Sequence, residues 1–423
     1  MKEPKITEQI DSFVFEWPAP QNLIAKVSRV RISSDGQVKG ELEIRWVEAG
    51  KEVYLLVSTH FNFSSEPTRN KFAKQLSEKL ALKIEWKEIL DYLARTVQNL
   101  VRLGDACIEV RAENNTPPPE QLLDRIIYKG VQNIIFGEKG VSKSTLAYLL
   151  TICVVLPWGD NPLNLKVPEK PVKALILDWE SDETIFRYYL SRLQRGMNLP
   201  ICSLFYRRCN LPLIDDIEAI QKYIESTGAE LLVIDSLGAA AGGERGELKG
   251  SESALLFNSA LRKLKTTSLI IGQTRKGDDD KKKTIFGSTY FTYYARNIFE
   301  LYHGHENYED TEHLALFHRE CNLGKKMPPM GLRIDFNNTT GGINIEREAI
   351  SIAEFVEKVS VSMRILEILK GGAMSQKELK ETTEASYASI GMALKRLNSQ
   401  GKVCKVDKKW GLKVFGDSFE NSN

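Results

Sequence analysis

The feature that most constrains the fold is a short segment in which an apolar stretch, a glycine-containing turn and a helix-like stretch follow one another directly. Residues 131–136 end in Ile-Ile-Phe and have the apolar content of a buried strand. The turn that follows reads GEKGVSKS, from Gly137 to Ser144, and a further apolar stretch begins after it. A turn of this kind wraps its backbone N–H groups around an anion at a helix N-terminus. The segment therefore predicts an α/β domain with an anion-binding turn.

The turn follows the phosphate-binding pattern GxxxxGK[ST] except at one position. We expect Lys143 to reach the β- and γ-phosphates of ATP and the Ser144 hydroxyl to ligate Mg²⁺. Ser142 stands where the pattern has its second glycine, and a positive φ there would cost a serine about 1 kcal/mol or more. A plain turn before a core helix is the alternative interpretation. The expected ATP-binding residues are Gly137, Glu138, Lys139, Gly140, Val141, Ser142, Lys143, Ser144 and Thr145.

Two further apolar runs end in acidic residues. Residues 174–178 end in Asp178 and are followed by Trp179 and Glu180, and residues 231–235 end in Asp235. The carboxyl ends of parallel strands face the ligand crevice of an open sheet. One carboxylate there can hold Mg²⁺ while another polarises the attacking water. A solvated acid at a strand end is the common alternative, and the preceding phosphate-binding turn favours the functional interpretation.

The chain divides by composition into three segments and a linker. Residues 1–111 combine period-2 stretches at 26–32, 38–46 and 52–58 with two helical patterns, which predicts a small α+β domain of unknown role. Residues 112–119 end in three prolines and form a stiff linker. Residues 120–345 alternate strands with helices, which predicts a mostly parallel sheet. The strand candidates in that segment are residues 131–136, 173–178, 231–235, 268–272, 297–302 and 314–318.

With these motifs in this order, residues 120–340 resemble the RecA-type P-loop ATPase core, and within it the RepA/DnaB-like group of ring-shaped replicative helicases. The resemblance implies an α/β fold with a RecA-like core and ATP and Mg²⁺ as ligands. It implies that Glu180 is the catalytic base and that Asp235 lies on the Mg²⁺ side. It also implies that Gln273, at the end of the Ile-Ile-Gly-Gln stretch, is the polar residue that senses the γ-phosphate.

In that family, loops after these strands face a central channel and hold single-stranded DNA. The resemblance implies such a role for a charged segment after Gln273 and for a glycine-rich segment after Asp235. Three aspartates in the first segment argue against a simple phosphate groove, and a solvated loop is the alternative. The basic residues implied are Arg275, Lys276, Lys281, Lys282 and Lys283 in the first segment and Arg245 and Lys249 in the second.

Related ATPases also complete the site with a basic residue from a neighbouring copy. Arg319, just beyond an apolar strand, and Arg296, after the stretch GSTYFTYY, are the two candidates. A basic residue at an exposed strand end is commonly plain surface, so one chain alone leaves this choice open. The resemblance implies a homo-oligomer, with a hexamer favoured.

Residues 355–415 have the pattern of a winged helix-turn-helix. Ser375 and Glu378 form a capping-box pattern, a further helix starts near residue 386, and residues 402–414 read as a β-hairpin. Eleven Lys and Arg oppose five Asp and Glu between 359 and 415. We expect contact with duplex DNA, and contact with a protein is the alternative. The expected DNA-binding residues are Tyr387, Lys402, Lys405, Lys408 and Lys409.

Composition sets the remaining expectations. The 58 basic and 56 acidic residues balance overall, so the basic C-terminal segment is visible only when charge is read by segment. We expect a cytoplasmic protein, because no signal peptide, membrane span or CxxC pair is evident. The favoured function is an ATP-dependent DNA helicase or translocase of a plasmid, phage or mobile element. The alternatives are an ATP-switched DNA-binding recombination mediator or regulator and, less favoured, a small-molecule kinase.

Overall fold

The structure is a computed structural model of the 423-residue chain, and it forms two compact units. One unit comprises Met1–Glu120, Cys209–Glu230 and Ala240–Thr266, and the other comprises Gln121–Arg208, Leu231–Ala239 and Thr267–Asn423. The residues that the structure describes are 2–48, 50–79, 84–104, 106–112, 115–242, 250–274, 285, 290–304, 310–337, 339–350, 355, 360–383 and 385–413.

The first unit contains an antiparallel meander in the order β1-β2-β3-β4-β5. The three period-2 stretches of the sequence lie in β3, β4 and β5, as predicted. Two strands before them were not predicted, and the residues of β1 are all exposed, so its sequence carries no alternation to detect. The strands are β1 (Lys5–Gln9), β2 (Ser12–Trp17), β3 (Leu23–Ile32), β4 (Val38–Glu48) and β5 (Lys51–Asn62).

Two helices provide the other layer of this meander's core. Helix α1 (Glu66–Lys79) begins after Ser65, whose hydroxyl accepts from the Thr68 N–H at 3.3 Å. Helix α2 (Trp86–Leu103) is strongly amphipathic and places one apolar face in the core cluster with the sheet. Helices α5 (Leu213–Thr227) and α7 (Gly250–Leu264), which contact each other, belong to the same unit.

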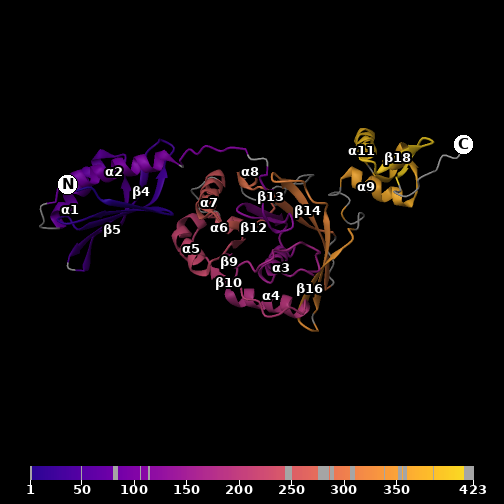
Figure 1. Ribbon diagram of the computed structural model, residues 1–423, viewed down its shortest axis with the longest axis horizontal. Coiled ribbons are helices and arrows are strands. Elements are labelled where there is room, and N and C mark those ends of the chain that lie inside the picture. The colour runs from indigo at the N-terminus through magenta and orange to yellow at the C-terminus, as the bar shows by residue number, and fades with distance from the viewer. Residues whose placement is uncertain are drawn as a thin grey trace. The chain divides into compact units, whose positions relative to one another are not determined.

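The second unit contains a large, mostly parallel sheet in the order β10-β9-β11-β12-β8-β13-β14-β15-β16 (Figure 1). The strands from β10 to β13 pair in parallel, and β14, β15 and β16 extend the sheet antiparallel from β13. The strands are β8 (Gln132–Gly137), β9 (Ala174–Asp178), β10 (Phe205–Arg208), β11 (Leu231–Asp235), β12 (Thr267–Gln273), β13 (Asn297–His303), β14 (Thr311–Cys321), β15 (Met330–Asn337) and β16 (Gly342–Glu348).

The strand register gathers the motif residues at one edge of this sheet. Asp235 at the end of β11 lies opposite Asp178 at the end of β9, and Gln273 at the end of β12 lies opposite Gly137 at the end of β8. Because β11 and β12 also pair in parallel, these four residues share the carboxyl edge of neighbouring strands. The sequence prediction of a ligand crevice at these strand ends agrees with this register.

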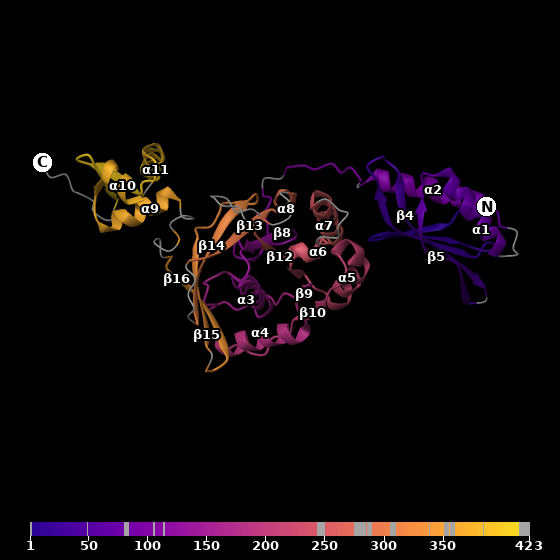
Figure 2. The ribbon, with the colours of Figure 1, turned by 180° about the vertical axis from the view of Figure 1, so that it is seen from behind.

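Helix α3 (Lys143–Val155) leaves the turn after β8 and packs against β8, β11 and β12. Its residues from Leu146 to Val154 are buried all round the helix, as expected of a helix inside a core. Helix α4 (Glu183–Gly196) runs beside β16 in both views (Figure 2) and starts at Asp182, whose carboxylate accepts from the Ile185 N–H at 3.0 Å. Shorter elements are β6 (Gln121–Leu123), β7 (Ile127–Tyr128), α6 (Leu237–Ala240) and α8 (Tyr290–Tyr294).

The last elements of the chain are three short helices and a small antiparallel sheet, coloured yellow in Figure 2. The capping box is present: the Glu378 N–H donates to Ser375 Oγ at 3.2 Å, and the Ser375 N–H donates to Glu378 Oε2 at 2.6 Å. Asp407 and Lys408 have φ of 47° and 68° and form a tight hairpin turn. The elements are α9 (Val361–Ile368), the 3₁₀ turn Leu369–Gly371, β17 (Met374–Ser375), α10 (Gln376–Thr383), α11 (Tyr387–Ser399), β18 (Val403–Val406) and β19 (Lys409–Leu412).

Cys153, Cys202 and Cys209 are buried, and burial raises the pKa of Cys153 to about 12, so this thiol stays protonated. Across the described ranges, every helix is too short or too polar to cross a bilayer.

Candidate nucleotide site

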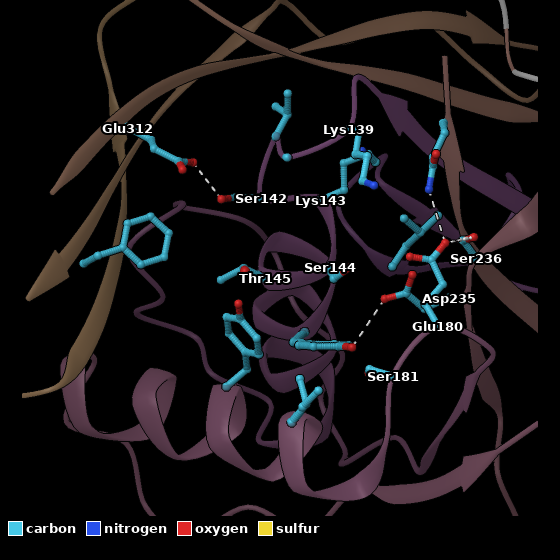
Figure 3. Close-up of a pocket in the computed structure, with 18 residues that line it drawn as sticks. Lys139, Ser142, Lys143, Ser144, Thr145, Glu180, Ser181, Asp235, Ser236 and Glu312 are labelled. Atoms are coloured by element: carbon cyan, nitrogen blue, oxygen red, sulfur yellow. Dashed lines mark hydrogen bonds between the residues drawn. The ribbon is translucent and has the colours of Figure 1, made fainter. Parts of the chain in front are cut away.

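A cavity of about 450 Å³ opens at the carboxyl edge of the parallel strands (Figure 3). The residues that line it come from the turn after β8, from the ends of β9, β11 and β12, from α4 and from β14 and β15. These segments lie between residues 139 and 336 of the chain and meet only in the fold. The sequence-predicted residues that line the cavity are Lys139, Gly140, Val141, Ser142, Lys143, Ser144, Thr145, Glu180, Asp235 and Gln273.

The turn itself has the backbone that its glycines suggest. Gly140 has φ of 86°, and a Cβ on Gly137 would lie 2.3 Å from the Leu301 carbonyl oxygen, so neither position suits another residue. Ser142 has φ of 22° and ψ of 31°, inside the left-handed region. Ser142, at the second glycine position of the pattern, therefore has a backbone conformation that favours glycine. Holding a serine in this conformation costs about 1 kcal/mol.

Lys143 begins α3 and is 8% exposed. Its ammonium donates to the Glu138 carbonyl within the turn, and burial lowers its pKa while Asp235 and Glu180 oppose that shift. A buried ammonium close to two carboxylates can exchange the Glu138 carbonyl for a phosphate oxygen. Lys143, Ser144 and Asp235 are thus brought together as the sequence predicted.

Asp235 is the most perturbed carboxylate of the cavity. It is 5% exposed, and burial, together with the charges of Glu180 and Asp178, raises its pKa to about 6. The Ser144 hydroxyl and the Tyr148 hydroxyl are hydrogen-bonded to it, the latter at 3.4 Å from Oδ2. A cation at this point would relieve the carboxylate of its unfavourable charge.

The oxygen atoms at this point suit Mg²⁺. Mg²⁺ prefers hard oxygen ligands and binds proteins through one or two carboxylates together with substrate phosphates. The Ser144 hydroxyl and the Asp235 carboxylate provide such oxygens, and the raised pKa of Asp235 indicates a place for positive charge. Ser144 and Asp235 would therefore hold the ion, which would neutralise phosphate charge when bound.

Glu180 lies in the turn after β9, and three contacts set its position. Its Oε1 accepts hydrogen bonds from the Ser236 hydroxyl and from Gln273 Nε2, the latter at 3.2 Å. Its backbone N–H donates to Asp178 Oδ1 at 2.9 Å. A carboxylate held this way at the side of the phosphate-binding turn is placed to accept a proton from an attacking water.

A cluster of three aromatic residues that contacts Asp178 and Asp235 was not predicted from the sequence. Tyr206 Oη donates to Asp178 Oδ2 at 3.1 Å, and its ring stacks on Phe186 at 4.8 Å between centroids. Phe186 in turn meets Tyr148 edge to face at 5.2 Å. Tyr148, within the otherwise apolar run Leu146–Leu150 of α3, is the sequence signal for this contact, because a buried phenol needs a polar partner.

Glu312 on β14 is another residue of the cavity that the sequence did not indicate. Its Oε2 accepts a hydrogen bond of 2.6 Å from Ser142 Oγ, so the residue that replaces the second glycine has its own partner. The available signal is a charged residue just before the apolar run Leu314–Phe317, but its partner lies 170 positions away.

The two arginine candidates have different surroundings. Arg319 on β14 pairs with Glu300 on β13, with 2.6 Å between Nε and Oε2, and the Glu300 side chain is 4% exposed. The guanidinium also lies 4.7 Å from the centre of the Phe317 ring. Arg296 is exposed and follows α8. Neither side chain lines the cavity.

The expected DNA-binding residues fall into two sets. Arg245, Lys249, Arg275, Lys276, Lys281, Lys282 and Lys283 all lie outside the described residues. In the C-terminal elements, Lys402, Lys405, Lys408 and Lys409 are exposed, and Tyr387 at the first position of α11 is 53% exposed. Ser386, just before it, caps α11 by accepting from the Ser389 N–H at 3.2 Å.

A parallel sheet with a phosphate-binding turn after one strand and carboxylates after its neighbours has the arrangement of a P-loop nucleotide-binding domain. An AAA domain family model matches residues 100–279, which contain the turn, both acidic strand ends and Gln273. A KaiC-like protein from the hyperthermophilic archaeon Pyrococcus horikoshii OT3 is similar at 15% identity and a TM-score of 0.38, over 52% of this chain and 90% of that chain. No curated protein matches the chain.

Proposed function

We propose that the protein is an ATP-driven DNA motor, a helicase or translocase that acts in the replication of a plasmid, phage or mobile element. Copies of the chain form a ring, with a hexamer favoured, and hydrolyse ATP with Mg²⁺ at their interfaces. Glu180 activates the attacking water, and Lys143 neutralises charge on the phosphates. Arg319 or Arg296 from a neighbouring copy completes the site.

The observation that carries this proposal is the hydrogen bond from Gln273 to Glu180. Gln273 ends β12, and after Thr274 the basic residues Arg275 and Lys276 follow in the sequence. A polyanion bound by that segment would therefore act on the residue that holds the proton acceptor. This short path supports coupling between hydrolysis and a nucleic-acid strand.

The C-terminal elements support a second contact with DNA. Residues 359–415 carry a net charge of about +6, and the four lysines around the β18–β19 hairpin are exposed. In our proposal α11 enters the major groove of a duplex as part of a winged helix, with Tyr387 near the bases, and the hairpin lysines contact phosphates.

The motor is tested with the purified protein, ATP, Mg²⁺ and a forked duplex. We expect unwinding, stimulation of ATP hydrolysis by single-stranded DNA and an assembly whose mass is a multiple of 47.9 kDa. The Lys143→Ala variant is the control, and it should show neither unwinding nor stimulated ATP hydrolysis. Absence of both ring assembly and unwinding in the wild-type protein would contradict the proposal.

Duplex binding has a separate test. A Lys405→Ala/Lys408→Ala variant should bind duplex DNA more weakly and lower the slope of log K against log salt by about 2. Lys380→Ala is the matched control, because Lys380 is an exposed lysine of the same basic segment on α10, outside the hairpin. An unchanged slope in the double variant would count against a DNA-binding hairpin.

The basic C-terminal elements also support a second candidate function. An ATP-switched recombination mediator or regulator would use α11 and the hairpin to select a duplex site and would use ATP to control assembly. It predicts slow hydrolysis that single-stranded DNA barely stimulates, together with sequence-selective duplex binding. The rate of hydrolysis with and without single-stranded DNA separates the two candidates.

A further inference from the structure

Glu312 is a charged residue next to an apolar part of the sheet face. In the β14–β15 register Glu312 lies opposite Ile334, and Leu314 lies opposite Leu332. Leu314, Leu332 and Ile334 are fully buried in the core cluster that includes α3. Side chains two residues apart on a strand share a face. The core face therefore continues outward to Glu312 and ends there in a carboxylate that lines the nucleotide cavity.

Phe336 lies on the same face, two residues beyond Ile334, and also lines the cavity. The Arg192 guanidinium lies 5.8 Å from the centre of its ring, and the Arg192 side chain is anchored by a 3.1 Å hydrogen bond from Nε to the Gly341 carbonyl. The ring is thus held at the rim of the cavity by a neighbouring cation.

The cavity has two chemically distinct ends. Figure 3 shows Glu312 on one side and Glu180 and Asp235 on the other, with Ser142 and Lys143 of the turn between them. Lys143, Ser144 and the two acids define where the β- and γ-phosphates lie. A nucleotide extended along the cavity from that end therefore places its nucleoside toward Glu312.

The chemistry of Glu312 indicates which part of the nucleotide it contacts. An ionised carboxylate is only a hydrogen-bond acceptor, and it repels phosphate oxygens. Glu312 contacts Ser142, which directly precedes Lys143, so it lies near the phosphates rather than at the far end of the nucleoside. The donors of a nucleotide closest to its phosphates are the ribose hydroxyls, and acidic residues bind ribose hydroxyls in other nucleotide sites.

We propose that Glu312 binds the ribose hydroxyls of the nucleotide, with Phe336 against the base, so that the site selects ribonucleotides over deoxyribonucleotides. The Ser142 hydroxyl, donating to Oε2, holds the carboxylate in place for this contact. Ser142, at the second glycine position, then contributes to nucleotide selectivity by positioning Glu312. This inference rests on ATP hydrolysis at the site and is independent of any action on DNA.

The test compares ATP, 2′-deoxy-ATP and ITP as substrates of the wild-type protein, Glu312→Ala and Glu312→Gln. We expect the wild-type protein to favour ATP over 2′-deoxy-ATP by about tenfold in kcat/KM, the worth of one charge-assisted hydrogen bond. Glu312→Ala should bring that ratio close to one, and Glu312→Gln should give an intermediate ratio. The ratio of ATP to ITP should stay the same in all three proteins.

Glu320→Ala is the matched control, because Glu320 is an exposed acid on the same strand. An ATP to 2′-deoxy-ATP ratio that is the same in Glu312→Ala and in the wild-type protein overturns the proposal. A lower ratio of kcat/KM for ATP over ITP in Glu312→Ala than in the wild-type protein also overturns the proposal, because Glu312 would then contact the base. The shift in melting temperature with each nucleotide gives the same comparison for binding alone, so it still decides the question if turnover is absent and the proposed function fails.

Discussion

The Glu180 backbone N–H donates a 2.9 Å hydrogen bond to Asp178, so one strand-end acid sets the position of another. Asp178 is fully buried, and it also accepts from the Ser181 N–H at 2.9 Å, the Ser181 hydroxyl at 2.5 Å and Tyr206 at 3.1 Å. The turn that carries Glu180 is therefore built around Asp178. Asp178 does not line the cavity, so we expect it to act through Glu180 rather than on the nucleotide.

This arrangement predicts a selective effect on turnover. Asp178→Ala should lower kcat for ATP by about ten- to a hundredfold and change KM by less than about threefold, because the phosphate-binding turn is untouched while Glu180 is misplaced. Steady-state kinetics measures both constants. Glu183→Gln, an exposed acid nearby that pairs with Arg187, is the control and should behave as wild type. A change confined to KM would contradict the positioning role.

The raised pKa of Asp235 predicts a pH-dependent gain in stability on its removal. Because the pKa of Asp235 is about 6 in the folded protein and the ordinary value of 3.8 applies to the unfolded chain, ionising Asp235 at pH 7 destabilises the metal-free protein. Asp235→Asn should therefore raise the free energy of unfolding at pH 7 by up to about 3 kcal/mol and abolish ATP hydrolysis. The gain should shrink as the pH falls from 6 towards 4, because the carboxyl of the folded protein becomes protonated, and it should vanish below about pH 3, where the carboxyl is protonated in both states.

Denaturant unfolding in EDTA at pH 7 and pH 4 measures this difference. Asp160→Asn, at an exposed position, should show no gain at either pH. A destabilised Asp235→Asn protein at pH 7 would mean that the carboxylate is well satisfied without a cation, contrary to its surroundings.

Lys143 and Glu180 should separate binding from chemistry. Lys143→Ala should abolish hydrolysis and weaken ATP binding, because it removes the ammonium that faces the phosphates. Glu180→Gln should keep ATP binding and lower turnover at least about a hundredfold, because the amide no longer accepts the proton of water. Nucleotide titration and phosphate release measure the two properties. Wild-type turnover in Lys143→Ala would refute the assignment of the phosphate site.

Arg319 needs a test that separates its ion pair from any role in a neighbouring site. Arg319→Ala should lower the free energy of unfolding by about 3 kcal/mol, because the buried Glu300 loses this partner. Adding Glu300→Gln should restore most of that stability. If Arg319 acts on a neighbour's nucleotide, ATP hydrolysis by the double variant should remain slower than that of the wild-type protein. If the double variant hydrolyses ATP at the wild-type rate, Arg319 has a structural role alone.

The parts of the site that were predictable are local in sequence. The turn from Gly137 to Ser144 and the strand that ends in Asp235 carry their chemistry within a few residues, and parallel pairing brings such strand ends together. The predicted strands at 231–235 and 297–302 match β11 and β13 to within a residue.

The parts that were missed depend on contacts between distant residues. Ser142 is hydrogen-bonded to Glu312, and Arg319 to Glu300. No short sequence pattern predicts either contact, because the partners come together only in the folded sheet. Strand β15 was also missed, although Leu332, Ile334 and Phe336 alternate within it, because Gly331 and Asp335 weaken its strand signal. Strands β14 and β15 contribute Glu312 and Phe336 to the cavity, so the sequence predicted the end of the cavity at the phosphate-binding turn and missed the end that we propose for the nucleoside.

The measurement that tests the account most directly is the rate of ATP hydrolysis by the wild-type protein with and without single-stranded DNA, with Glu180→Gln in parallel. We predict hydrolysis that requires Mg²⁺, rises at least about fivefold on addition of single-stranded DNA and is nearly absent in Glu180→Gln. A rate that single-stranded DNA leaves unchanged, or turnover that persists in Glu180→Gln, would contradict a motor whose proton acceptor is Glu180.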